Sequence, residues 1–248
     1  MLYPDDEVVA DERRRFDHYD TFSAVDVSTT SWAGQIQSVT SRLRDHDAGF
    51  EGREVLDISG GPGFMTAHFA EHGARRAVVT EVSRDAVDGM RRNLPIDVVK
   101  FDYQGDRLRD VVEGMFDLVV IDYSINFCID LPGFARSLPE ILRPGGFVYL
   151  SWIHPTLGCF LRWQFDECMY NVLFRPETVD EVFTAAGFTV RAEMTDPPYD
   201  YRKYLPRKTR MVLDPFSRWY RARAPRGDVP FDRSLEQRAS VRIYQLDT

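Results

Sequence analysis

Short apolar runs alternate with helical patterns along most of the chain. Runs rich in Val, Ile, Leu and Phe predict strands at 53–58, 76–82, 96–102, 115–124, 145–152 and 188–194. Helical spacing predicts helices at 29–46, 64–73, 84–94, 106–114, 130–142 and 175–187. This alternation is typical of a parallel sheet with helices on both faces. The last run, 239–246, alternates apolar and polar residues, and we expect it to form an edge strand.

Two stretches interrupt the alternation, and a polar segment precedes it. Residues 153–174 and 195–237 are rich in aromatic residues, and the second is also rich in Pro and Arg. Loops of this length in a compact domain usually form lids, binding insertions or interfaces. A chain of 248 residues suits one domain with a substantial core. We therefore expect a single domain over 1–248, with a helical cap at 1–50 and the two insertions as a lid or an interface.

The composition narrows the range of partners and compartments. The chain has 31 Lys and Arg against 39 Asp and Glu, so its formal net charge is −8. Because an acidic surface repels a phosphate backbone, we expect no nucleic-acid partner. The apolar runs are too short to cross a membrane. The first residues lack the apolar segment of a secretory signal, and three widely spaced cysteines argue against a disulfide framework. These features favour a cytoplasmic protein.

The sequence LDISGGPGF, residues 56–64, leaves the first predicted strand through a turn with few side chains. Ligands of α/β sheets bind at the carboxyl ends of the strands, where this turn lies. A dinucleotide-binding turn has the pattern Gly-x-Gly-x-x-Gly, but counted from Gly61 the last position holds Thr66. Asp57 would also repel a pyrophosphate, whereas it suits a cationic ligand. These residues disfavour NAD as the cofactor.

This turn and several later segments resemble those of class I S-adenosylmethionine-dependent methyltransferases. The stretch VLDISGGPGF resembles the first motif of that family, with Ser59 where the family usually has its first glycine. The stretches VVTEVS, KFDY, FDLVVIDYSIN and ILRPGGFVYLS resemble the next four motifs, in the family's order. The resemblance implies a Rossmann-like α/β fold. It has a mostly parallel seven-stranded sheet with an antiparallel last strand and helices on both faces, and the aromatic insertions would cover the site.

The resemblance also implies which residues bind S-adenosylmethionine. Glu81 would accept hydrogen bonds from both ribose hydroxyls, since a carboxylate has two acceptor oxygens, and Asp102 would accept one from the adenine amine. Ser59 fits the turn if its φ angle is negative. The expected cofactor-binding residues are Asp57, Ser59, Gly60, Gly61, Gly63, Glu81, Val82, Asp102, Tyr103, Asp122 and Tyr19. Of these, Tyr19 is inferred from FDHYDTFS, which resembles segments that fold over the cofactor.

Candidate catalytic residues follow the fourth and fifth predicted strands. Methyl transfer requires that the acceptor be aligned and, for a hydroxyl or ammonium nucleophile, deprotonated. His154 could serve as the general base near neutral pH, or it could bond to backbone groups before Pro155. Tyr123 and Asn126 could orient the acceptor or the donor, or they could simply pack at a strand end.

The aromatic residues after the fifth strand have two interpretations. They could wall a pocket for an apolar substrate, or they could pack on the sheet. They are Trp152, Phe160, Trp163, Phe165, Tyr170 and Phe174. The same region also holds potential metal ligands, namely His154, Cys159, Asp166, Glu167 and Cys168. This cluster contains no Cys-x-x-Cys or His-x-x-x-His pattern, so we expect no metal.

The favoured hypothesis is metal-independent methyl transfer to an oxygen or nitrogen of a small molecule. Two alternatives remain open. One is a reaction at another sulfonium bond, which cyclises or transfers the aminocarboxypropyl arm and releases methylthioadenosine. The other is a non-catalytic, cofactor-binding partner subunit.

The arginine-rich insertion could bind an anionic substrate through Arg210 or Arg218, or it could form a homodimer through 195–237. Both are favoured over RNA binding because the rest of the chain is acidic.

Overall fold

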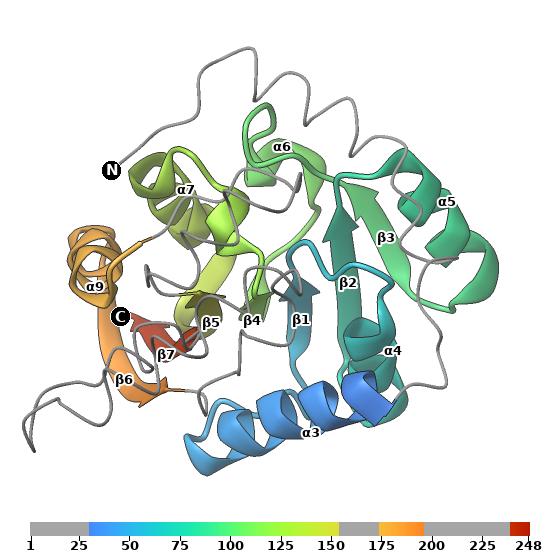
Figure 1. Cartoon of the computed structure of the whole chain (residues 1–248), viewed down its shortest axis with the longest axis horizontal. Coiled ribbons are helices and arrows are strands. Elements are labelled where there is room, and N and C mark those ends of the chain that lie inside the picture. Colours follow the sequence, from blue (N-terminus) through green and yellow to red (C-terminus); the bar gives the residue numbers. More distant parts are fainter. Residues whose placement is uncertain (1–29, 154–173, 196–238) are drawn as a thin grey trace, which may run out of the picture.

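The computed structural model describes residues 30–153, 174–195 and 239–248 (Figure 1). Within these ranges, seven strands form one sheet in the order β3-β2-β1-β4-β5-β7-β6. The strands are β1 (Glu54–Asp57), β2 (Arg76–Glu81), β3 (Asp97–Lys100), β4 (Phe116–Asp122), β5 (Leu142–Ile153), β6 (Phe188–Thr195) and β7 (Ala239–Leu246). The helices are α3 (Thr30–Asp45), α4 (Phe64–Glu71), α5 (Arg84–Asn93), α6 (Leu108–Val111), α7 (Leu131–Ser137) and α9 (Pro176–Ala185), with 3₁₀ turns η1 (Ile125–Phe127) and η2 (Leu138–Glu140).

The strands of the sheet run in the relative directions that the sequence predicts. Strands β1 to β5 are parallel, and β7 runs antiparallel to both of its neighbours, β5 and β6. Helices α3 and α4 cover one face, where Leu43 and Phe69 pack against Val120 and Tyr149. Helices α7 and α9 cover the other face. The expected α/β fold, with a mostly parallel sheet and helices on both faces, is therefore confirmed.

Strand β7 lies inside the sheet, so the prediction of an edge strand at 239–246 is wrong. The alternation of apolar and polar residues in β7 suggested an exposed face, but the polar residue Arg242 is buried, with only 6% of its surface exposed. The Arg242 guanidinium is paired with Asp180 of α9, at 3.1 Å from Nε to Oδ1, and with Glu193 of β6 at 3.3 Å. The Tyr244 hydroxyl donates to Asp180 Oδ1 at 2.6 Å. A buried polar side chain can thus occupy a central strand when its partners are also supplied.

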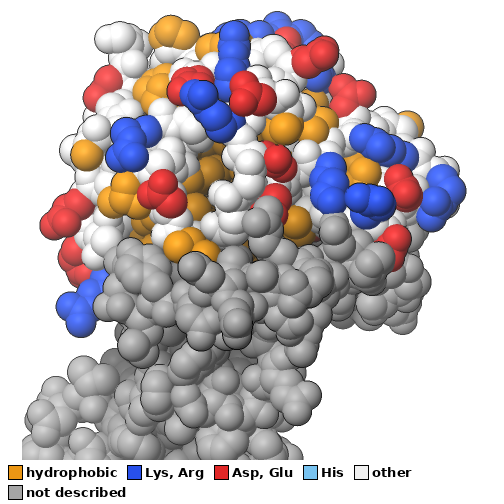
Figure 2. Space-filling model, turned by 90° about the horizontal axis from the view of Figure 1, so that it is seen from above, with side chains coloured by type: hydrophobic (Ala, Val, Ile, Leu, Met, Phe, Trp, Pro, Cys, Tyr) orange, Lys and Arg blue, Asp and Glu red, His pale blue; other side chains and the backbone are white. Residues whose placement is uncertain are grey.

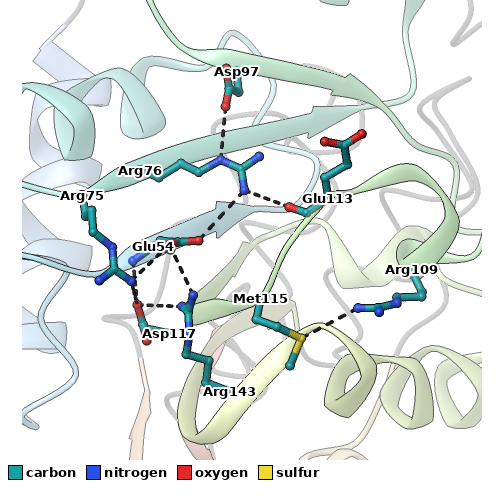
Figure 3. A network of polar contacts seen from close by, with 9 residues as sticks. All are labelled: Glu54, Arg75, Arg76, Asp97, Arg109, Glu113, Met115, Asp117 and Arg143. Atoms are coloured by element: carbon teal, nitrogen blue, oxygen red, sulfur yellow. Dashed lines mark hydrogen bonds and ion pairs between the residues drawn. The ribbon is translucent and has the colours of Figure 1, made fainter.

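Charged side chains join several strands at the amino ends of the sheet (Figure 3). The Glu54 carboxylate lies 3.1 Å from Arg75 and 3.3 Å from Arg143. Asp117 lies 3.1 Å from Arg143 and accepts a hydrogen bond from the Glu54 backbone N–H at 2.8 Å. The network therefore links the amino ends of β1 and β4 to neighbouring parts of the chain. It lies at the amino ends of the strands, whereas the glycine turn lies at their carboxyl ends.

The described part of the molecule has a mixed surface. Figure 2 shows acidic and basic side chains intermingled on one face. Among the described helices, none is both long enough and apolar enough to cross a bilayer. The predicted cap and the two insertions fall mostly on 1–29, 154–173 and 196–238, which lie outside the described residues. The predicted division of the domain into these parts stays a prediction.

Candidate cofactor and active site

The glycine-rich turn connects β1 to α4 and has three left-handed residues. The φ angles are 55° at Ser59, 56° at Gly61 and 76° at Gly63. The condition stated for Ser59, a negative φ, is therefore not met, and the serine occupies the turn in the left-handed region. The Ser59 backbone N–H donates to Thr80 Oγ1 at 3.1 Å, which helps to hold this conformation against a cost of about 1 kcal/mol.

The glycines of the turn meet different surroundings. A Cβ atom on Gly60 would lie 2.5 Å from Asp57 Oδ2, and one on Gly63 would lie 2.7 Å from Met90 Sδ. These two positions face the interior, where a side chain would have to displace its neighbours. A Cβ atom on Gly61 would meet nothing within 4 Å. Gly61 therefore exposes its backbone to open space, as a surface on which a ligand could lie.

Asp57 lies beneath this turn with 2% of its surface exposed. Its Oδ2 accepts a hydrogen bond from Thr66 Oγ1 at 2.7 Å. Burial raises the pKa of Asp57 to about 7, against the opposing effect of the Thr66 bond. The negative charges of Asp122 and Glu81 raise this pKa further. A cationic ligand would relieve the repulsion, whereas a phosphate would add to it.

Glu81 ends β2 next to the turn and is also buried, with 7% exposed. Its Oε1 accepts from the backbone N–H groups of Val82 and Ser83, at 2.7 and 3.2 Å. Its Oε2 accepts from the Gly61 N–H at 3.1 Å. Burial raises the pKa of Glu81, and these three bonds oppose that rise. These bonds hold the Glu81 carboxylate next to Gly61, the residue of the turn that faces open space.

The segment after β3 packs behind the turn. The Tyr103 hydroxyl lies 3.0 Å from Ser124 Oγ, which in turn donates to the Ile58 carbonyl at 3.1 Å. Burial raises the pKa of Tyr103, so its hydroxyl stays protonated. Asp102 Oδ1 accepts from the Gln104 N–H at 2.9 Å, in a short turn at the same edge of the sheet. Both residues are half-buried.

Asp122 ends β4, two residues beyond Val120, which pairs with Asp57 of β1. It accepts hydrogen bonds from Ser151 Oγ at 2.5 Å and from Gln35 Nε2 of α3. Tyr123 follows with a φ of 56° and is 36% exposed. Its backbone N–H donates to Ser151 Oγ at 2.9 Å. The carboxyl ends of three neighbouring strands, β2, β1 and β4, thus bring three acids together around one turn.

Asn126 is buried, with 1% of its surface exposed, and its side-chain amide makes two hydrogen bonds to the backbone of a single residue. Its Oδ1 accepts from the Ile153 N–H at 3.1 Å, and its Nδ2 donates to the Ile153 carbonyl at 3.4 Å. Ile153 ends β5 and directly precedes His154. His154 and Tyr19 lie outside the described residues. Asn126 therefore holds the strand end from which His154 follows.

The aromatic candidates that are described pack in the core. Trp152 is fully buried, and its Nε1 donates to the Phe174 carbonyl at 3.1 Å. Phe174 itself is 2% exposed. These two side chains therefore pack in the core rather than wall a pocket. The other aromatic candidates, together with Arg210 and Arg218, fall outside the described ranges.

Sequence reasoning overlooked the hydroxyl and amide groups that support the acids. Thr66 binds Asp57, Thr80 binds the turn, and Gln35 reaches Asp122 from a helix 87 residues earlier. Thr66 carried a signal, because a polar residue in the apolar stretch FMTAHFA needs a buried partner. Gln35 carried none, because its partner is distant in sequence.

No group of three or more His, Cys, Asp and Glu in the described parts of the chain could hold a metal ion. One spacing noted for metal ligands does occur at the end of α4, where His68 of the helix and His72, which follows it, lie four residues apart. Their rings stack at 3.9 Å between centroids, and His72 Nδ1 lies 2.8 Å from the His68 carbonyl oxygen. The cluster that begins at His154 lies outside the described residues.

A pocket of about 470 Å³ lies beside this site, between α3 and strands β4 and β5. Helix α3 lines it with Gln35, Ser38 and Arg42. The strands line it with Tyr149 and the Asp122–Tyr123 pair. The pocket therefore shares Asp122 with the cluster of acids, and its volume suits a small molecule.

Comparison with known proteins agrees with this geometry. Residues 32–193 match the methyltransferase domain family, which is more than half of the chain. The chain is 24% identical over 155 residues to the ubiquinone biosynthesis O-methyltransferase of Chelativorans sp. (strain BNC1). That match covers 57% of this chain and 61% of that enzyme, so the chain spans about three fifths of this relative's length.

Solved structures share the fold at lower identity. An S-adenosylmethionine dependent methyltransferase from Mesorhizobium loti matches with a TM-score of 0.56 at 15% identity, over 83% of this chain and 96% of that chain. The cyclase SpnF matches with a TM-score of 0.58 at 14% identity, over 97% of this chain and 92% of that chain. Together with the family match, the acids and the glycine turn lead to one conclusion: the chain belongs to the class I S-adenosylmethionine-dependent methyltransferases.

Proposed function

We propose that this enzyme transfers the methyl group of S-adenosylmethionine to an oxygen or nitrogen atom of a small molecule, without a metal ion. The observation that carries this proposal is the placement of Asp57, Glu81 and Asp122 on three adjacent strand ends around the glycine turn. The O-methyltransferase relative supports oxygen as one acceptor atom.

The residues of the turn fit this cofactor by charge and by shape. Bound S-adenosylmethionine supplies an activated methyl group on a cationic sulfur, next to an ammonium group. The buried acids would offset these charges, and open space over Gly61 would let the ligand approach the backbone. Glu81, oriented by three backbone N–H groups, would accept bonds from the ribose hydroxyls. Asp102 and Tyr103 would border the adenine.

The acceptor would be aligned and deprotonated at the ends of β4 and β5. We assign the general base to His154 and the alignment of the acceptor to Tyr123, whose ring is exposed beside Asp122. Asn126 would act through its two bonds to Ile153, which position the chain before His154. Alignment of the two reactants and removal of water lower the barrier of such a reaction.

The nucleoside product tests the reaction type. The protein is incubated with methyl-labelled S-adenosylmethionine and a panel of small phenols, amines and carboxylic acids, and the products are identified by mass spectrometry. The proposal predicts S-adenosylhomocysteine and a labelled small molecule, both lost in Asp57→Asn. Methylthioadenosine as the nucleoside product would instead establish a reaction of the aminocarboxypropyl arm. Binding of the cofactor without turnover over the whole panel would favour a non-catalytic subunit.

Two further expectations belong to this proposal. We place the enzyme in the cytoplasm, and we assign the segment 195–237 to a homodimer interface. Light scattering of the full chain and of a variant with this segment replaced by a short linker tests the second point. A wild-type dimer that becomes monomeric in the variant supports it, and a monomeric wild-type protein contradicts it.

A further inference from the structure

We propose that the pocket between α3, β4 and β5 is the acceptor site, and that it selects an acceptor with a carboxylate group bound by Arg42. The inference rests on the proposed function, because it names the class of molecule that would receive the methyl group. The reacting oxygen or nitrogen of that molecule would lie toward Asp122.

The register of the sheet places the two ends of the pocket. Asp122 pairs with Ser151, and Tyr149 pairs with Val120, two residues earlier on each strand. Side chains two residues apart point to the same face of a sheet, so Tyr149 and Asp122 both face α3. At about 3.3 Å of rise per residue, their Cα levels differ by roughly 7 Å. The carboxylate and the phenol therefore mark opposite ends of one pocket.

The end of the pocket near Tyr149 carries a positive charge. Arg42 of α3 donates from Nη1 to the Tyr149 hydroxyl at 3.2 Å. Tyr149 is fully buried, so its hydroxyl acts by fixing the position of the guanidinium. Arg42 is half-buried in the pocket wall. A guanidinium in this setting recognises a carboxylate by charge and by paired N–H donors.

The other end of the pocket carries a negative charge next to the proposed methyl donor. Asp122 is held by Gln35 and Ser151, and it contributes to the raised pKa of Asp57. An amine or a hydroxyl can donate a hydrogen bond to this carboxylate, whereas a second carboxylate would be repelled. The two ends together match a molecule with its nucleophile at one end and its carboxylate at the other, for which a para-substituted benzoate is a suitable probe.

A second arginine on the same helix offers a matched control. Arg44 lies two residues from Arg42 but points elsewhere: its guanidinium pairs with Glu51 at 2.7 Å and lies over the Phe50 ring. Arg44→Gln removes the same charge from α3 without changing the pocket wall. A difference between Arg42→Gln and Arg44→Gln thus reports on position rather than on net charge.

The test compares a carboxylate with its neutral amide. Binding of 4-hydroxybenzoate and 4-hydroxybenzamide, and of 4-aminobenzoate and 4-aminobenzamide, is measured by calorimetry with S-adenosylhomocysteine present. We expect the wild-type protein and Arg44→Gln to bind each carboxylate on the order of tenfold more tightly than its amide, which is the size of one charge-assisted contact. Arg42→Gln is expected to lose this preference, and Tyr149→Phe to lose part of it.

Several results would overturn the inference. They are equal affinity of the wild-type protein for carboxylate and amide, absence of binding of all four probes, and a preference that persists in Arg42→Gln. The wild-type comparison stands even if a variant does not fold. Titration with S-adenosylhomocysteine alone separates this inference from the proposed function: cofactor binding without carboxylate preference rejects only the pocket assignment, whereas absence of cofactor binding rejects the methyltransferase site.

Discussion

The buried carboxyl group of Asp57 should lower the free energy of unfolding of the protein at neutral and higher pH. The pKa of this group is 3.8 in its ordinary state and about 7 in the folded protein, mainly because of burial. Between these two values the unfolded chain loses a proton that the folded chain keeps. The free energy of unfolding therefore falls as the pH rises from about 4 to about 7, and this contribution is constant at higher pH.

The size of the effect follows from the shift in pKa. About three pH units at about 1.4 kcal/mol each give an upper limit of about 4 kcal/mol at pH 8. Asn at position 57 has nearly the same shape, stays neutral, and its amide oxygen can accept the Thr66 bond. We therefore expect Asp57→Asn to raise the free energy of unfolding at pH 8 by about 2 to 4 kcal/mol, while it weakens cofactor binding.

Urea unfolding from pH 4 to pH 8, without ligand, measures this difference. The two proteins should be about equally stable at pH 4, and the gap should widen up to pH 7 and then stay constant. Asp88→Asn, on the exposed side of α5, is the matched control and should show no such gap. Lower stability of Asp57→Asn at pH 8, or a gap that does not change with pH, would refute the reasoning.

Three other substitutions test the framework of the site. Gly63→Ala should lower the free energy of unfolding by about 1 to 3 kcal/mol, because it strains a left-handed residue and brings a Cβ to 2.7 Å from Met90 Sδ; urea unfolding measures this, and an unchanged midpoint would contradict it. Asn126→Ala should cost about 2 kcal/mol, because both polar backbone groups of Ile153 lose their partner, and steady-state kinetics should show a lower kcat with an unchanged KM for the cofactor; unchanged kcat would reject the positioning role. Asp117→Asn should cost about 1 kcal/mol at low salt and less at 1 M NaCl, and a loss that does not depend on salt would show that the ion pairs contribute little.

Much of the fold follows from local patterns in the sequence. The apolar runs at 53–58, 76–82 and 115–124 predict three strands, and the structure brings together the acids near their carboxyl ends, Asp57, Glu81 and Asp122. The place of β7 did not follow, because Arg242 reads as a solvent-facing residue unless its partner on α9 is known. Burial of a polar group depends on pairs that are far apart in sequence.

In the candidate site, too, some features follow from local sequence and others depend on residues that are far apart in the chain. The nearness of Asp57 to the glycine turn could be predicted because the turn and the acid are adjacent in the chain. The φ angle of Ser59 could not, because it is fixed by a bond to Thr80, 21 residues away. Arg42 was passed over in favour of Arg210 and Arg218, because only the packing of α3 on β5 brings its guanidinium to Tyr149.

The most direct test of the central claim is calorimetric titration with S-adenosylhomocysteine. The wild-type protein should bind one equivalent, and Glu81→Gln should bind at least about tenfold more weakly, because it replaces the carboxylate that we propose as the acceptor of the ribose hydroxyls. Glu71→Gln, on the exposed end of α4, should bind as the wild-type protein does. Absence of binding to the wild-type protein, or equal affinity in Glu81→Gln, would contradict the site described above.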